Sequence, residues 1–162
     1  MLTILSLLIN TAMAAPQNYG FLSNKGLLFV TVNKADTLLS GVAHDHAIQA
    51  VGWSGKATWD VDDFSACSLV INVPVNNLAV DKPSVRKAAG LSGEVSESQQ
   101  KEIKGNMLSK GQLNASEHPM ITFKSTSCSG SGNNATINGN FTMRGVTKAV
   151  SVPATVNTSN GL

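Results

Sequence analysis

Alternating apolar and polar residues dominate this chain of 162 residues. From Trp53 to Val61, apolar side chains occupy one face of an extended segment and polar side chains the other, which predicts a strand with one packed and one wet face. The same period of two predicts further strands over residues 27–32, 67–75, 120–128, 135–143 and 149–156. About seven short strands separated by turn signals are typical of an antiparallel sandwich or barrel.

The middle of the chain breaks this alternation and holds most of the Glu and Gln side chains. Ser96 or Ser98 can cap a helix over residues 99–108, in which Ile103 and Met107 lie one turn apart. We therefore expect one short amphipathic helix that lies against the sheet. Its apolar side chains are interpreted as core packing, not as part of a cofactor site.

Composition narrows the class of protein further. The length fits one domain of ordinary size, and the hydrophobic fraction of 42% is too high for a disordered chain. Only 14% of the residues are charged, and the formal net charge is +2. Because no cluster of Lys and Arg accompanies so small a net charge, the composition argues against nucleic-acid binding.

The first residues carry the pattern of an export signal. An apolar run over residues 1–9 is followed by Ala12-Met13-Ala14, which has the small-x-small pattern of a secretory cleavage site, although no Lys or Arg precedes the run. The run is too short to cross the ~30 Å core of a bilayer as a helix. We expect a signal peptide over residues 1–14 and one mature domain over residues 15–162, with no membrane-spanning segment.

Cys67 and Cys128 are the two cysteines of the chain. Their spacing fits neither a CxxC redox centre nor a zinc knuckle. If the strands over residues 67–75 and 120–128 are antiparallel neighbours, the two cysteines come close enough to form a disulfide. Two separate buried thiols are the alternative, and the sequence leaves both open.

His44-Asp45-His46 is the other feature with possible chemistry. On a strand, His44 and His46 face one side and Asp45 the other, so two imidazoles can share a metal ion, with His118 as a candidate third ligand. Hydrogen-bonded structural histidines at a strand end are the alternative, which we favour. The chain has neither a Gly-x-Ser-x-Gly nucleophile motif nor a zinc-binding HExxH helix, so the sequence does not indicate a hydrolase.

Two segments in the second half resemble the YceI-like family of exported bacterial proteins. Residues 118–127 match a Pro-x-Ile-x-Phe-x-Ser strand, and residues 137–150 match Gly-x-Leu-Thr-x-x-Gly-Val-Thr-Lys-Pro-Val. Phe141 stands where the family usually has Leu, and Ala149 replaces the usual Pro. The resemblance covers residues 27–156 and is weaker in the first half.

The resemblance implies an all-β fold, an antiparallel lipocalin-like β-barrel of about eight strands with one short helix inserted. Family members continue with two strands that close the barrel, so we expect this chain to be truncated at its C-terminus. The apolar interior would hold a polyisoprenoid or a similar amphiphile, which a barrel of this size can enclose. The inward candidates are Val30, Val32, Trp53, Trp59, Leu69, Ile71, Val73, Ile121, Phe123, Ile137 and Phe141. For each of them, plain core packing is the alternative to ligand contact.

Three functional hypotheses follow. The preferred one is a non-catalytic carrier in the bacterial periplasm or outside the cell, which binds a small amphiphilic lipid and needs no cofactor. The alternative is a metal-binding or redox-linked periplasmic protein that uses His44 and His46. A β-domain that binds a protein partner and no small ligand is the third.

Overall fold

The computed structural model describes residues 15–21, 23–33, 45–60 and 62–157. The predicted signal peptide and His44 lie outside the described residues. The strands are β1 (Gln17–Gly20), β2 (Phe29–Val32), β3 (His46–Gln49), β4 (Ser54–Trp59), β5 (Ser68–Pro74), β6 (Ala79–Val80), β7 (Met120–Ser131), β8 (Asn134–Met143) and β9 (Val146–Thr155). The helices are α1 (Pro83–Ala88) and α2 (Glu97–Leu108), with short 3-10 helices η1 (Phe64–Ala66) and η2 (Val75–Asn77).

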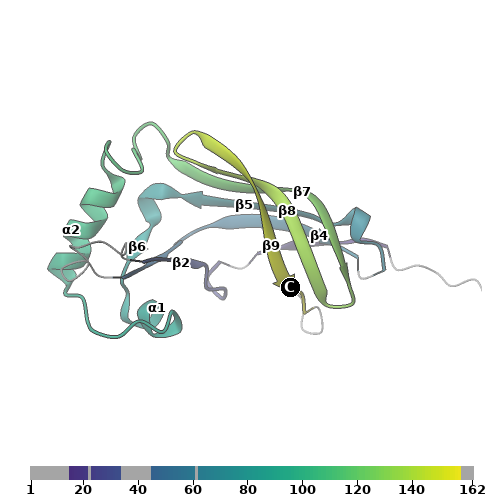
Figure 1. Cartoon of the computed structure of the whole chain (residues 1–162), viewed down its shortest axis with the longest axis horizontal. Coiled ribbons are helices and arrows are strands. Elements are labelled where there is room, and N and C mark those ends of the chain that lie inside the picture. The colour runs from purple at the N-terminus through teal and green to yellow at the C-terminus, as the bar shows by residue number, and fades with distance from the viewer. Residues whose placement is uncertain (1–14, 22, 34–44, 61, 158–162) are drawn as a thin grey trace, which may run out of the picture.

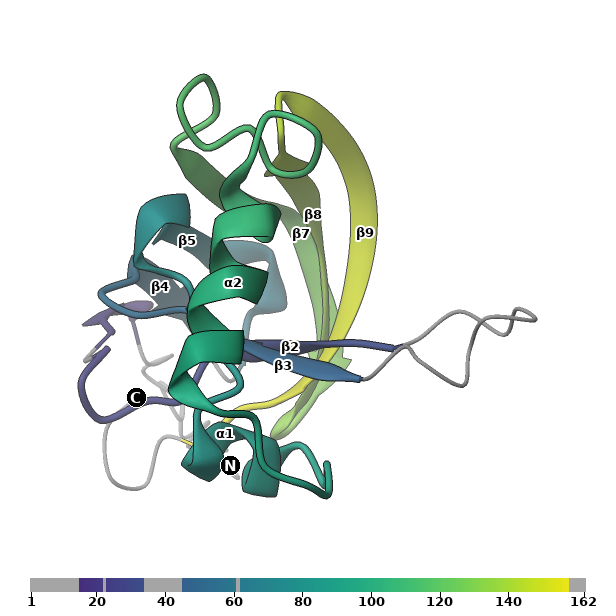
Figure 2. The same ribbon diagram turned by 90° about the vertical axis from the view of Figure 1, so that its left-hand side faces the viewer.

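The strands form two antiparallel sheets. One has six strands in the order β1-β4-β5-β7-β8-β9, and the other has three in the order β2-β3-β6. Figure 1 shows the long strands of the larger sheet side by side, with α2 at one end, and Figure 2 shows β9 bowed along one side. The antiparallel all-β fold is confirmed. Within the described residues β1 and β9 are edge strands that each pair on one side only, so the sheets do not close into one barrel.

Two clusters of buried side chains form the core. The first consists of Ile48, Ala50, Trp53, Val73, Val75, Leu78, Val80 and Ala115. The second consists of Trp59, Phe123, Ala135 and Ile137. Ile71 on β5 packs against both clusters, so the two are joined along the same face of the six-stranded sheet.

Helix α2 packs against the first cluster. The Ser96 side chain accepts a hydrogen bond from the Gln99 backbone N–H, and the Gln99 side chain accepts one from the Ser96 backbone N–H. This capping box begins the helix two residues earlier than predicted. Ile103, Met107 and Leu108 pack against the first cluster, as expected. Neither described helix is long and apolar enough to cross a membrane.

The last three strands are joined by tight turns. Met143 pairs with Val146 across Arg144 and Gly145, whose φ angles of 51° and 71° are those of a type I′ hairpin. The other turn is shorter than expected, because the strand predicted over residues 120–128 does not end at Cys128. Strand β7 continues to Ser131, because its backbone goes on pairing with β8 where the side chains become polar and the apolar alternation ends.

Short elements escaped the sequence analysis. β1, β3 and β6 contain two to four residues each, too few for a period of two to be visible. Helix α1 has six residues and begins at Pro83, a residue suited to the first turn. These elements are positioned by tertiary contacts: β6 pairs with β3, and α1 contacts β3.

A disulfide joins Cys67, just before β5, to Cys128 on β7. The two Cα atoms are 5.8 Å apart. β5 and β7 are antiparallel neighbours, the arrangement on which the sequence-based pairing depended. Both cysteines are half-buried and pack against the second cluster, so the bond fixes that end of the sheet.

Candidate functional site

The candidate ligand site is one face of the six-stranded sheet, which we call the inner face. The register places Ile71 opposite Phe123 and Phe123 opposite Phe141, so side chains from three strands form one row. Neighbouring rows follow from the pleat, because residues two apart share a face. The predicted lining residues on the strands of this sheet lie on the inner face: Trp59, Leu69, Ile71, Val73, Ile121, Phe123, Ile137 and Phe141. Trp53, the residue before β4, belongs to the same core cluster as Val73 and so extends this face.

Two glycines let aromatic rings lie directly on the strands of this face. A Cβ on Gly139 would lie 2.5 Å from Cζ of Phe123, and a Cβ on Gly55 would lie 2.8 Å from Cδ2 of Phe21. Both distances are shorter than real Cβ contacts allow, so only glycine fits beneath these rings. Phe21, which the sequence analysis did not single out, thereby becomes part of the inner face.

Val30 and Val32 lie apart from the other predicted lining residues. Their side chains are 60% and 51% exposed and do not belong to the described core, so their contact with a ligand stays a prediction. They lie on β2, an edge strand of the three-stranded sheet, and Figure 2 shows β2 and β3 extending away from α2. An edge strand has a neighbouring strand on one side only. Alternation by itself therefore does not decide whether the apolar side chains of such a strand are packed.

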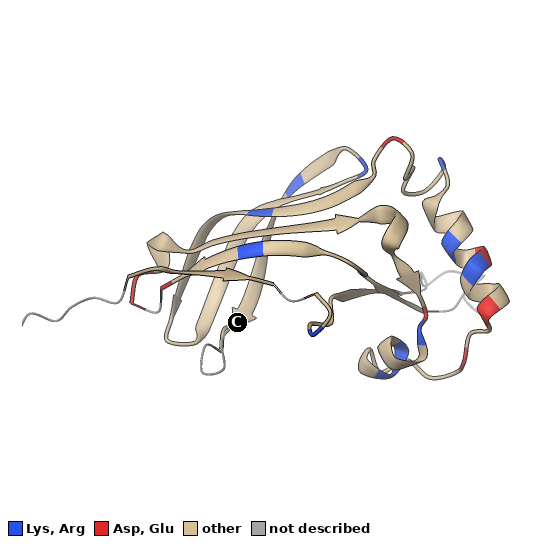
Figure 3. Cartoon of the chain, turned by 180° about the vertical axis from the view of Figure 1, so that it is seen from behind, with Lys and Arg blue, Asp and Glu red and all other residues tan. Residues whose placement is uncertain are grey.

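The inner face becomes more exposed toward β9. Val150 is half-buried, and Val152, which pairs with Ile137, is 43% exposed. Figure 3 shows that most charged residues lie on the helices, on their connections and at strand ends, whereas the sheet carries few. The apolar surface therefore continues from the buried clusters to an uncovered side of the sheet.

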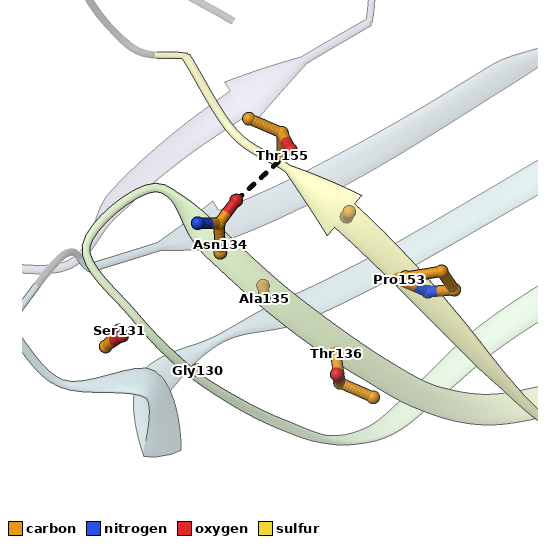
Figure 4. Close-up of a pocket in the computed structure, with 8 residues that line it drawn as sticks. Gly130, Ser131, Asn134, Ala135, Thr136, Pro153 and Thr155 are labelled. Carbon is orange, nitrogen blue, oxygen red and sulfur yellow. Dashed lines mark hydrogen bonds between the residues drawn. The ribbon is translucent and has the colours of Figure 1, made fainter.

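Two hollows involve none of the predicted lining residues, although the first is lined in part by Ala135 of the second cluster. One, of about 490 Å³, lies between the β7–β8 turn and the end of β9 (Figure 4). Its small and polar lining includes Asn134, whose Oδ1 accepts a hydrogen bond of 3.3 Å from Thr155 Oγ1. The other, of about 270 Å³, lies between β6 and α2 and is lined in part by Lys82, Lys101 and Lys104. Neither resembles an apolar lipid site.

Trp53 carries an unpaired polar atom within the apolar inner face. The residue is 8% exposed, and its ring centroid lies 5.3 Å from that of Phe21. Among the described residues, its Nε1 is the only buried side-chain nitrogen or oxygen without a hydrogen-bond partner. Buried polar groups are nearly always hydrogen-bonded, so this indole N–H calls for an explanation.

His46 belongs to a network centred on Asp81, a residue that the sequence analysis missed. His46 Nδ1 donates to Asp81 Oδ2 over 2.6 Å, and the Ala47 backbone N–H donates to Asp81 Oδ1 over 2.9 Å. Arg86 Nη1 donates to the same Oδ1 over 2.8 Å. The Asp81 side chain is fully buried. Burial, the largest influence, raises the pKa of Asp81, but the hydrogen bonds from Ala47, His46 and Arg86 together hold it below its ordinary value.

Arg86 extends this network to the backbone. It donates to the carbonyl oxygens of Asp45, Ser92 and Gly93, and so ties α1 to the start of β3 and to the loop before α2. Asp81 has a φ of 50°, a conformation that Asp adopts more readily than most residues. Pro83 signals a helix start after Asp81, but no sequence pattern signals that Arg86 turns back to the carboxylate.

The structure does not assemble the predicted metal site in its described part. His46 is engaged with Asp81, and His118 lies against Gly145 in the β8–β9 turn. Across residues 15–21, 23–33, 45–60 and 62–157, no three His, Cys, Asp or Glu side chains come together as a possible metal site. Because His44 lies outside these ranges, metal binding by His44 and His46 stays a prediction.

The family model described as the YceI-like domain matches residues 31–161. The crystal structure of Burkholderia cenocepacia BcnA is similar with a TM-score of 0.55 and 20% identity, over 71% of this chain and 61% of BcnA. A mutant CJ YCEI protein with a monobromobimane guest is similar with a TM-score of 0.52 and 12% identity, over 68% of this chain and 54% of that one. No curated protein matches the chain. The chain thus spans less than two thirds of the length of these two proteins.

Proposed function

Because the chain belongs to the YceI-like domain family, whose members are known for binding hydrophobic ligands, we propose that it is a non-catalytic carrier of an isoprenoid-type lipid or a similar amphiphile. The observation that carries this proposal is the continuous apolar inner face. It runs from the first core cluster through Ile71 to the second, and it is partly uncovered toward β9. A long hydrocarbon chain is the ligand that such an extended apolar surface suits.

The energetics support binding without chemistry. Removing apolar surface from water contributes roughly 25 cal/mol per Å². A long lipid tail therefore gains enough to offset the entropic cost of immobilisation and to reach micromolar affinity. No bond has to be made or broken for a carrier to work.

We also propose that the protein acts outside the cytoplasm, in the bacterial periplasm or secreted. The predicted cleavage site after Ala14 supports export. The disulfide between Cys67 and Cys128 supports it independently, because such bonds persist in oxidising compartments.

The test is native mass spectrometry of the full chain purified from a bacterial periplasm. The expected result is an adduct of several hundred daltons, the order of a lipid mass, that releases a polyprenyl fragment on activation. Ile71→Glu places a charge between the two clusters and should abolish the adduct.

Val70→Glu is the matched control. Val70 is the preceding residue on the opposite face of β5, where its register neighbours are Lys56 and Lys124. A carboxylate there is favourably placed, so this variant should keep the adduct. If folded Ile71→Glu retains the lipid as well as Val70→Glu does, the inner face is not the binding site.

A further inference from the structure

The indole N–H of Trp53 is a hydrogen-bond donor without a partner on the apolar inner face. Its cluster neighbours, such as Val73, Val75 and Leu78, have apolar side chains that offer no hydrogen-bond acceptor. A buried donor without a partner is costly, and native structures seldom keep one unless something binds it. The atom belongs to the surface on which we have placed the ligand, so a ligand atom is a natural partner.

We propose that Trp53 is a specificity-determining residue whose Nε1–H donates a hydrogen bond to a neutral oxygen of the bound amphiphile. This inference rests on the proposed function. The oxygen belongs to a carbonyl, ester or ether group. A carboxylate or phosphate is disfavoured, because the apolar neighbours would leave its charge buried and unpaired.

The position of Trp53 also orients the ligand. Trp53 belongs to the first cluster, against which Ile103 and Met107 of α2 pack. The oxygen-bearing end therefore lies near α2. The tail extends past Ile71, which contacts both clusters, toward Trp59 at the other end of the face. A pure hydrocarbon can occupy the same path but leaves the indole N–H unpaired.

The experiment compares two probes on the full chain: a long-chain methyl ketone and the alkane of equal chain length. Binding is titrated by native mass spectrometry, and the carbonyl stretch of the bound, isotope-labelled ketone is recorded by infrared spectroscopy. Trp53→Phe removes the donor and keeps an aromatic ring. Trp59→Phe is the matched control, because Trp59 is also buried on the inner face but belongs to the second cluster.

For Trp53→Phe we expect about tenfold weaker binding of the ketone and no weakening for the alkane, the effect of one lost hydrogen bond. The carbonyl stretch should move to higher frequency. Trp59→Phe should change both affinities by the same factor and leave the stretch in place. If Trp53→Phe weakens both probes equally, or neither, Trp53 only packs or is paired by water, and the inference fails. If the wild-type chain binds neither probe, the proposed function itself fails.

Discussion

Replacing Asp81 by Asn tests whether the buried charge network holds the three-stranded sheet, α1 and the loop before α2 together. Asn has nearly the same shape but no charge, so the change removes the counter-charge of the Arg86 guanidinium, whose side chain is 10% exposed. It also alters the acceptors used by His46 and Ala47. Removing one partner of a buried, hydrogen-bonded ion pair costs about 3–5 kcal/mol. That is a large part of the ~5–15 kcal/mol by which domains are usually stable.

The dependence on pH gives this prediction a second signature. The pKa of Asp81 is lowered from its ordinary value of 3.8 in the folded protein, so the unfolded chain binds a proton first as the pH falls. The stability supplied by Asp81 is therefore complete above about pH 4 and is lost as the pH falls through the lowered folded-state pKa. Asp81→Asn should flatten the fall in unfolding free energy over this acid range.

Urea unfolding followed by circular dichroism, at neutral pH and then at decreasing pH, measures both effects. Asp63→Asn is the control, because hydrogen bonds from the Ser65 side chain and backbone lower the pKa of Asp63 as well, but this carboxylate is fully exposed. We expect a much smaller change for the control than for Asp81→Asn. Equal midpoints for wild type and Asp81→Asn at neutral pH would refute the stabilising role of the network.

Two further predictions concern the sheet. Replacing Cys67 and Cys128 by Ser should lower the unfolding free energy by about 2–4 kcal/mol, because the bond closes a loop with a sequence separation of 61; wild type in reductant should show the same loss in thermal unfolding. Gly139→Ala should cost about 1–3 kcal/mol, because the new Cβ displaces the Phe123 ring and crowds the backbone oxygen of Lys124. Gly105→Ala in α2, where a Cβ meets nothing within 4 Å, is the control and should stabilise the protein by about 0.5–1 kcal/mol. If both glycine variants change the unfolding free energy in the same direction, the packing described for Gly139 is wrong.

The sequence by itself determined which side chains share a face. Alternation has a fixed period of two, so Leu69, Ile71 and Val73 had to lie on one side of their strand whatever that strand pairs with. One local signal was also confirmed: Ser96, one of the two candidate caps, is the N-cap of α2. The family resemblance also depended on contiguous residues.

Only the tertiary structure decided which faces are covered and which distant residues meet. Val30 has the same alternation as Ile71 but lies on an edge strand, so neighbours, not period, left it exposed. Asp81 meets His46 across 35 residues and is held by Arg86, a contact that no local pattern encodes. Likewise, the sequence left the pairing of the two cysteines open until β5 and β7 became neighbours. Burial and long-range pairing depend on the whole chain, because a side chain's environment is supplied by residues far from it in sequence.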